Sequence, residues 1–287
     1  MSQQNSLKPL IAICGNNQAE AVALVLKVLP GVCDRFDVQF LGSHAEAELR
    51  TGTLSRCAVF FEQDSVGYRR LGGLSKSCRR VRFPLLEFNL LWPFNCINPY
   101  NRPESPRFPF GRFPNGNSFI IGCIERGLST EEILALDLSG EWHASWPNLN
   151  ALFMSESARL SLQDSRCTVA LGSYILKHFR KQRLFTAVQN PTNVLLSALI
   201  LRLLHAALGS DCNISSSDVD MTLKNFGTRD LFGALSVPIH PKVAEHFDLV
   251  WYSPHDTYNI FDVQALTYER YVQQMVESAR KHVARSA

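Results

Sequence analysis

The sequence predicts an α/β protein with a mostly parallel sheet, extra helices and a proline-rich loop. Short apolar runs alternate with helix-compatible stretches in the first third of the chain, and amphipathic helical patterns dominate the remainder. The composition agrees, because 46% hydrophobic and 19% charged residues suit a globular core better than a disordered chain. A chain of 287 residues is a common length for one large α/β unit, so we predict a single domain over 1–287.

The first part of that domain, residues 1–91, reads as a βαβαβ core. Leu10 to Cys14 is a short apolar run closed by Gly15, and Ala, Val and Leu then recur at helical spacing over 19–29. A polar, helix-compatible stretch separates the later apolar runs, which favours parallel strands with right-handed crossovers. Strands are expected over 10–14, 37–41, 57–61 and 81–91.

The second and third parts are a proline-rich segment, 92–116, and a region of helices and remaining strands, 117–287. Prolines among aromatic and arginine residues exclude long regular elements from 92–116 and predict an ordered loop or lid. In the third part a capping pattern over 129–132 begins a short helix, and 191–209, with Pro at its start and Gly at its end, is the clearest helix. Further helices are expected over 148–162, 241–247 and 267–283, and a strand over 249–252.

Charge, cysteine spacing and hydropathy exclude several classes of protein. The formal net charge is +3, which gives no general reason to expect nucleic-acid binding. The eight cysteines include no CxxC pair, so neither a zinc site nor a secreted disulfide framework is indicated, and no metal is expected. The apolar run 9–14 is too short for a signal peptide, and polar residues interrupt 194–208 as in a buried helix. We therefore expect a cytoplasmic protein without a membrane span, of undetermined oligomeric state.

The turn after the first strand, Cys14-Gly15-Asn16-Asn17-Gln18, is the first candidate site. Its glycine allows a sharp backbone turn, and the helix that follows offers unpaired amide groups to an anion or an acyl oxygen. Ligands of open α/β sheets bind outside the carboxyl ends of strands, and the amide side chains here add donors. A plain turn with an asparagine cap is the alternative. Cys14 is a candidate nucleophile if the helix amino terminus favours its thiolate, and a buried packing cysteine otherwise.

A loop histidine beside a carboxylate forms the second candidate site. His255 and Asp256 follow the strand expected over 249–252 and precede the last helix. Histidine titrates near neutral pH, and an adjacent carboxylate can fix its tautomer, so His255 is a candidate general base. The alternative is a surface histidine with Asp256 capping a turn. Another loop histidine, His240, has the simpler alternative of shaping the turn before the helix over 241–247.

The densest basic cluster, residues 177–183, is the third candidate site. A phosphate could bind to Lys177, Arg180 and Arg183, because lysine offers a point charge and arginine can donate two parallel hydrogen bonds. The alternative is a solvated helix end whose cations favour the carboxyl-terminal dipole. A smaller arginine cluster over 79–82 has the same ambiguity.

Several ordered blocks of the chain resemble the WcbI-type polysaccharide-biosynthesis acetyltransferases. The resemblance implies a three-layer α/β/α fold of the SGNH-like kind that binds coenzyme A or acetyl-CoA and acetylates a sugar hydroxyl of a capsule. The blocks are Ile13 to Ala19, Phe83-Pro84 to Trp92-Pro93, Leu184-Phe185 to Asn190-Pro191-Thr192, and the tyrosine-rich helix that contains Tyr268 and Tyr271.

Two departures from the family pattern bear on mechanism. Related sequences often read Gly-Asn-Cys-Gln where this chain has Gly15 to Gln18, so Asn17 occupies the thiol position, and they often have His where this chain has Asn190. Asn17 cannot attack a carbonyl as a nucleophile would. Acetyl-CoA is already an activated thioester, however, and direct transfer needs only a base for the hydroxyl and donors for the oxyanion.

Direct acetyl transfer therefore fits these residues better than an acyl-enzyme, which would have to use Cys14 or a further residue as its nucleophile. His255 would act as base with Asp256 orienting it, the turn from Gly15 to Gln18 would stabilise the oxyanion, and the 177–183 cluster would hold the phosphates of the coenzyme. One alternative is an SGNH-like carbohydrate esterase with water as acceptor, although the chain has neither a Gly-Asp-Ser nor an Asp-x-x-His motif. Another is a non-catalytic protein that binds coenzyme A or a glycan.

Overall fold

The computed structural model describes residues 8–42, 53–64, 74–139, 146–227, 229–261 and 264–283. Contacts divide the chain into two compact units. The first unit comprises Met1–Leu86, Arg159–Leu176 and Asn193–Leu231, and the second comprises Glu87–Ala158, Lys177–Thr192 and Phe232–Ala287. Each unit is described by itself, and the single domain over 1–287 stays a prediction.

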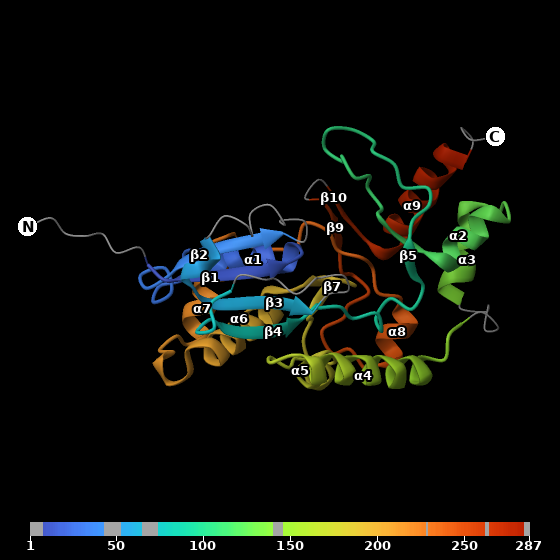
Figure 1. The fold of residues 1–287 in the computed structure, drawn as a ribbon. Helices are drawn as coiled ribbons and strands as arrows, with labels where there is room; N and C mark the ends of the chain where they lie inside the picture. The colour runs from blue at the N-terminus through green and yellow to red at the C-terminus, as the bar shows by residue number, and fades with distance from the viewer. Residues whose placement is uncertain are drawn as a thin grey trace, which may run out of the picture. The chain divides into compact units, whose positions relative to one another are not determined.

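The first unit is built on a four-stranded parallel sheet in the strand order β2-β1-β3-β4 (Figure 1). β1 is buried along its whole length and lies between β2 and β3, because its apolar residues serve both faces of the sheet. The sheet confirms the predicted α/β class and its mostly parallel strands. The strands are β1 (Leu10–Gly15), β2 (Asp37–Gly42), β3 (Cys57–Asp64) and β4 (Arg79–Pro84).

β4 ends at Pro84, whereas the sequence predicts a strand over 81–91. The side chain of Gln18 explains the early end. Its amide accepts from the Leu86 N–H at 2.9 Å and donates to the Leu86 carbonyl at 2.8 Å, so this backbone pairs with a side chain instead of a strand. The helix expected between β2 and β3 falls on residues 43–52, outside the described residues.

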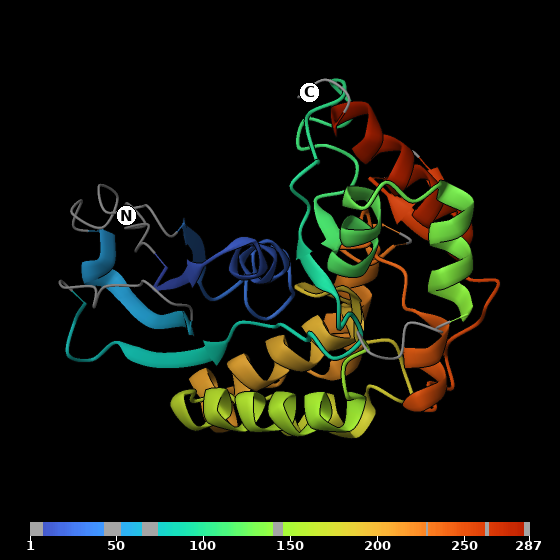
Figure 2. The same cartoon turned by 90° about the vertical axis from the view of Figure 1, so that its right-hand side faces the viewer.

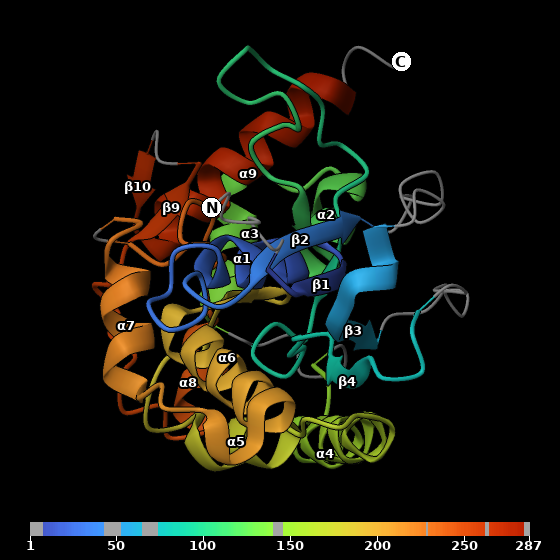
Figure 3. The ribbon, with the colours of Figure 1, turned by 60° about the vertical axis from the view of Figure 1, so that its left-hand side comes forward.

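Helices α1, α6 and α7 gather on the same side of this sheet (Figures 2 and 3). α1 contacts β1 and β2, α6 contacts β4, and α7 contacts both of the other helices. α6 begins two residues later than predicted, because Pro191 is paired in a short strand and Asp230 accepts from the Asn193 N–H at 2.6 Å. These helices are α1 (Asn17–Leu26), α6 (Asn193–Leu208), followed by the 3₁₀ turn η4 (Gly209–Asp211), and α7 (Ser216–Lys224).

α6 together with η4 is the one described helix that is long and apolar enough to cross a membrane by length and composition. Half of its most apolar window is buried within the structure, and Leu196, Leu199 and Leu203 are fully enclosed. Core helices have the same length and composition, and this burial agrees with the predicted buried helix.

The second unit has its core between helices α2, α3 and α9. All three helices contact one another, and rings such as Phe113 and Tyr271 meet edge to face at 5.2 Å in the buried cluster between them. The predicted capping pattern is confirmed, because Ser129 Oγ accepts from the Glu132 N–H at 3.1 Å and Glu132 accepts from the Ser129 N–H at 2.6 Å. The helices are α2 (Ser118–Glu125), α3 (Thr130–Ser139) and α9 (Tyr268–Val283).

The proline-rich segment contains only two short strands, β5 (Asn95–Ile97) and β6 (Asn115–Asn117), which pair antiparallel. The predicted absence of long regular elements is confirmed for this segment. Asn101 keeps it ordered, because its Oδ1 accepts from the Phe113 N–H at 3.0 Å. Gly111, at φ +77, lies against the Asn101 amide so closely that any Cβ there would overlap it.

The other helices and strands complete the list of elements. α4 begins in the second unit and ends in the first, and the predicted helices over 148–162 and 241–247 are confirmed. They are α4 (Leu149–Arg166), α5 (Gly172–His178), β7 (Phe185–Ala187), β8 (Asn190–Pro191), α8 (Pro241–His246), β9 (Tyr258–Ile260), β10 (Gln264–Leu266) and the 3₁₀ turn η2 (Thr53–Arg56).

The strand expected over 249–252 is wrong. Asp248, two residues after the end of α8, adopts a left-handed conformation at φ 51, and the Tyr252 N–H donates to the Leu249 carbonyl at 3.1 Å, so the chain turns here. Within this segment Trp251 is held by a hydrogen bond instead of strand pairing, since its indole N–H donates to the Phe179 carbonyl at 2.7 Å.

Candidate functional site

The turn between β1 and α1 requires glycine at position 15. A Cβ on Gly15 would lie 2.5 Å from the Ala19 Cβ and 2.5 Å from Gln63 Oε1, both far inside van der Waals contact. Next along the chain, Asn16 caps α1, because its Oδ1 accepts from the Gln18 N–H at 2.9 Å. The Asn16 N–H itself donates to Gln63 Oε1 at 2.9 Å. The turn is therefore fixed by the tight packing around Gly15 and by hydrogen bonds to the side chains of Asn16 and Gln63.

Gln18 faces the protein interior rather than a ligand. Its side chain is fully buried, its amide pairs in both directions with Leu86, and its Oε1 also accepts from Gln63 Nε2 at 3.1 Å. Because these bonds hold the loop after β4 in place, the expectation that Gln18 offers a donor to a ligand needs correction. Its role in this structure is to support the turn.

Asn17, in contrast, is exposed at the first position of α1. Neither its backbone N–H nor its side-chain amide has a hydrogen-bond partner among the residues that the structure describes. An unpaired N–H at a helix amino terminus lies at the positive end of the helix dipole and suits an anion or a developing oxyanion. Of the amide residues in the predicted turn, Asn17 is thus the one whose backbone N–H has no partner among the described residues.

Cys14 is buried, which supports the packing alternative over a nucleophilic thiolate. The side chain is only 3% exposed and belongs to a buried cluster with Leu10, Leu41 and Phe60. Burial raises the pKa of the Cys14 thiol to about 11, and the nearby charge of Glu62 adds to the rise. The thiol therefore stays protonated at neutral pH, where it is a poor nucleophile.

His255 lies on an exposed turn of the second unit, and its ring has no hydrogen-bond partner within the described residues. Asp256 does not contact this ring. Its carboxylate accepts from the Ser253 N–H at 3.3 Å, and the Ser253 hydroxyl accepts from the His255 N–H at 3.2 Å. The hydrogen bonds thus support turn capping for Asp256, and an orienting role toward His255 stays a prediction.

The three basic residues of the cluster have different surroundings. Lys177 is exposed in the last turn of α5, whereas the Arg180 guanidinium lies 5.3 Å from the ring centre of Phe179 and 5.6 Å from that of Phe153. The side chain of Arg180 is exposed, so its charge faces solvent from an aromatic support.

Arg183 has a different environment. Its guanidinium lies 5.6 Å from the ring centre of Trp251 and 5.8 Å from that of Tyr258. Its Nε and one terminal nitrogen are buried and have no hydrogen-bond acceptor among the described residues. Of the basic residues in the cluster, Arg183 is therefore the best candidate to bind an anion, because two of its nitrogens lack an acceptor.

A hollow lies wholly within the second unit and was not predicted as a site. It is partly open, has an empty volume of about 360 Å³, and is bordered by β5, β6, α9 and the segment before α8. Its lining consists of Leu91, Trp92, Pro93, Phe94, Asn95, Gly116, Asn117, Val237, Pro238, His240 and Tyr268. We call it the second-unit hollow.

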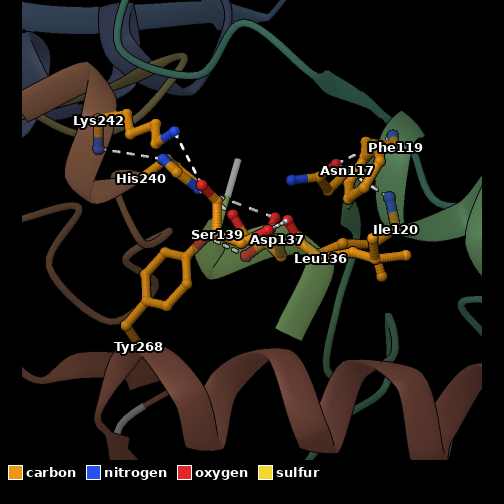
Figure 4. A network of polar contacts seen from close by, with 9 residues as sticks. All are labelled: Asn117, Phe119, Ile120, Leu136, Asp137, Ser139, His240, Lys242 and Tyr268. Atoms are coloured by element: carbon orange, nitrogen blue, oxygen red, sulfur yellow. Dashed lines mark hydrogen bonds and ion pairs between the residues drawn. The ribbon is translucent and has the colours of Figure 1, made fainter. Parts of the chain in front are cut away.

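A buried network of Asp137, His240 and Tyr268 supports one wall of this hollow (Figure 4). The Tyr268 hydroxyl donates to Asp137 Oδ2 at 2.7 Å, and His240 Nε2 lies 2.9 Å from the Asp137 carbonyl oxygen. Trp146 adds a ring contact, its centre 4.8 Å from that of His240. These residues come from α3, the start of α8 and α9, so the network ties three elements together.

The hydrogen bonds define the tautomer of His240. Its Nδ1 accepts from the Lys242 N–H at 3.1 Å as the cap of α8, so the ring proton lies on Nε2, which donates to Asp137. Burial lowers the pKa of His240, and burial likewise raises the pKa of Asp137. These bonds support the turn-shaping alternative for His240, and its ring has no lone pair free to act as a base.

The sequence gives only a weak signal for the other two members of the network. Asp137 follows Ile133 by one helical turn, and both are almost fully buried, so a carboxylate on the apolar face of α3 is the signal. Nothing in the spacing connects it with Tyr268, which lies 131 positions away. No cluster of His, Cys, Asp or Glu that could hold a metal occurs in the described parts of the chain.

Comparison with known proteins places the chain near one family. The family of the polysaccharide biosynthesis enzyme WcbI matches residues 10–211. A solved native structure of WcbI, described as a novel polysaccharide biosynthesis enzyme without a disulfide bond between coenzyme A and one of its cysteines, is similar with a TM-score of 0.71. The two share 17% sequence identity over 96% of this chain and 90% of that one, which shows a common fold. A search of curated proteins found no match.

Proposed function

Because the chain belongs to the WcbI family of polysaccharide biosynthesis enzymes, we propose that it transfers the acetyl group of acetyl-CoA directly to a sugar hydroxyl. The similar WcbI structure is described in terms of coenzyme A, which supports this molecule as the acyl carrier. The observation that carries direct transfer is the burial of Cys14, which raises the pKa of its thiol to about 11, together with the exposed Asn17, whose side chain cannot attack a carbonyl.

The proposed step has a simple atomic balance. The sugar hydroxyl oxygen attacks the carbonyl carbon of the thioester while a base takes the hydroxyl proton. The carbonyl oxygen becomes the oxyanion of a tetrahedral intermediate, which hydrogen-bond donors stabilise. Collapse of the intermediate breaks the C–S bond, and coenzyme A leaves as a thiolate that takes up the proton. The products are an acetylated sugar and free coenzyme A.

We assign the oxyanion donor to the backbone N–H of Asn17. It is unpaired within the described chain and lies at the positive end of α1, while Gly15 and the Gln18 amide network fix its position. Preorganisation of this kind matters, because a donor that need not move costs no reorganisation when the charge develops.

We assign the base to His255, whose ring nitrogens are not engaged by any described residue. His240 is the less suitable histidine, since both of its nitrogens are used in capping α8 and binding Asp137. For the phosphates of coenzyme A we propose Arg183 first, because its buried N–H groups lack acceptors, with Lys177 and Arg180 as exposed members.

Calorimetric titration of the purified chain with coenzyme A and acetyl-CoA tests the proposal without knowledge of the sugar. We expect micromolar binding, roughly −8 kcal/mol. His255→Ala should then bind acetyl-CoA as the wild type does but lose about 100-fold or more of its transfer rate. His205→Ala, which alters an exposed histidine of α6, is the matched control and should retain the rate.

Two outcomes would contradict the proposal. Absence of coenzyme A binding would remove the transferase and leave the esterase or the non-catalytic protein. Unchanged turnover of His255→Ala, with acetyl-CoA still bound, would remove this histidine as the base.

A further inference from the structure

The second-unit hollow has a lining that suits a neutral ligand. None of its described lining residues carries a formal charge, and the buried network holds His240 as the neutral Nε2–H tautomer. A phosphate or carboxylate would therefore find no cation there to offset the cost of leaving water. The lining argues against the charged parts of coenzyme A as its occupant.

Asn117 presents a fixed, unpaired donor in this hollow. Its Oδ1 caps α2 by accepting from the Phe119 N–H at 3.0 Å and the Ile120 N–H at 3.2 Å, so the orientation of the amide is set (Figure 4). The Nδ2 of the same amide has no partner among the described residues, and neither has the side chain of exposed Asn95. Two amide groups with open hydrogen-bonding capacity are suited to ligand hydroxyls.

Aromatic residues supply the rest of the lining. Trp92 is locked by donating its indole N–H to the Val237 carbonyl at 3.1 Å, and Phe94 packs on Trp146 with ring centres 5.2 Å apart. Tyr268 also lines the hollow, and its hydroxyl is held by the buried hydrogen bond that it donates to Asp137. Rigid rings beside a few oriented polar groups are the usual makeup of a small-molecule site.

From this arrangement we infer that the second-unit hollow binds one neutral pyranose unit of the sugar acceptor, with a ring hydroxyl accepting from Asn117 Nδ2. The inference rests on the proposed function, which requires a sugar as the second substrate. A lining without formal charge that presents two open amide groups suits a neutral sugar ring better than a coenzyme that carries phosphates.

Ligand-observed NMR with the full chain tests the site, using the methyl pyranosides of glucose, galactose and mannose as neutral probes. We expect at least one to bind, and Asn117→Asp to weaken that binding about five- to tenfold, because the donor is replaced by an acceptor. Aspartate caps helices as well as asparagine does, so α2 and the melting temperature should be preserved.

The matched control is Asn148→Asp at the start of α4. Asn148 caps that helix in the same way, its Oδ1 accepting from the Ala151 N–H at 3.0 Å, but it does not line the hollow. This variant should bind the sugar as the wild type does. Equal weakening in both variants, or no binding of any of the three probes to the wild type, would overturn the inference.

Titration of the same samples with coenzyme A separates this inference from the proposed function. Coenzyme A binding without sugar binding would overturn the sugar site and leave the transferase in place. Sugar binding that depends on Asn117, without coenzyme A binding, would support the site and overturn the transferase.

Discussion

At the scale of single residues, the proposed chemistry depends most directly on the backbone of Asn17. The preceding residue, Asn16, is extended at φ −87 and ψ −162, and Asn17 opens α1. Proline is well tolerated at the first helical position, where the N–H has no partner within the helix, and it requires an extended residue before it. The structure therefore permits a substitution that removes one N–H and leaves the helix intact.

We predict that Asn17→Pro retains the fold and coenzyme A binding but loses about 100- to 1,000-fold in transfer rate, the usual effect of removing an oxyanion donor. Asn17→Ala keeps the backbone N–H and should retain most of the rate. The measurement is single-turnover acetyl transfer with circular dichroism as the check on folding. A proline variant as active as the alanine variant would show that this N–H does not touch the oxyanion.

Residue roles were predictable from the sequence where they depend on near neighbours. The turn at Gly15 and the capping role of His240 are local, since the groups involved lie within a few positions of each other. The inward orientation of Gln18 was not predictable, because Leu86 lies 68 positions away and only the sheet brings the two together. The hydrogen bond between Asp137 and Tyr268 was not predictable for the same reason, because the two residues lie 131 positions apart.

At the scale of elements, α3 shows how much a helix depends on its first turn. Ser129 and Glu132 satisfy each other's N–H groups, and the Ser129 contacts lower the pKa of Glu132. The other end of α3 carries Asp137 into the network beside the hollow. The cap at Ser129 sets the start of α3, and it thereby helps to set the position of the Asp137 carboxylate.

We predict that Ser129→Ala lowers the free energy of unfolding by about 1 kcal/mol, the typical cost of losing a serine cap. Ser165→Ala, in the last turn of α4, removes an exposed hydroxyl that is not a cap and should be nearly neutral. Urea unfolding followed by circular dichroism compares the two. Equal effects would mean that the Ser129 cap adds no stability to α3.

Elements were predictable in proportion to how local their signals are. Helices α3, α4, α8 and α9 were found because caps and apolar periodicity lie within each segment. The run 249–252 looked like a strand because its residues are apolar, but the chain turns there, Val250 is exposed, and Trp251 is held by one hydrogen bond to the Phe179 carbonyl. Apolar composition alone favours a strand here, whereas pairing decides whether apolar residues form one.

At the scale of the whole molecule, stability should depend on pH through His240. The pKa of this residue is lowered in the folded protein from its ordinary 6.5, chiefly by burial, although Asp137 opposes the shift and Lys242 adds to it. A lowered histidine pKa gives stability that is present above 6.5 and is lost as the pH falls through the folded pKa. The contribution of Asp137 to the pH dependence of stability has the opposite sign. Its pKa is raised in the folded protein, so protonation of Asp137 adds stability as the pH falls through this raised pKa.

We predict that the melting temperature of the wild type falls more steeply below pH 6.5 than that of His240→Asn. Asparagine can cap α8 as histidine does but does not titrate, and Asp137, Lys242 and Tyr268 are common to both proteins. Thermal scans from pH 7.5 down to 5 would give the two slopes. Parallel curves would mean that the imidazole does not contribute to acid sensitivity.

The bonds between Gln18 and Leu86 also affect the order in which the first unit folds. They join groups 68 positions apart, so the entropy of closing that loop must be overcome before they can form. β1, β3 and β4 have to be aligned first, since only their parallel pairing brings the Leu86 backbone within reach of α1. We therefore expect the turn that presents Asn17 to be completed late in folding, so that a partly folded form of this unit would contain much of the sheet and little of the proposed oxyanion site.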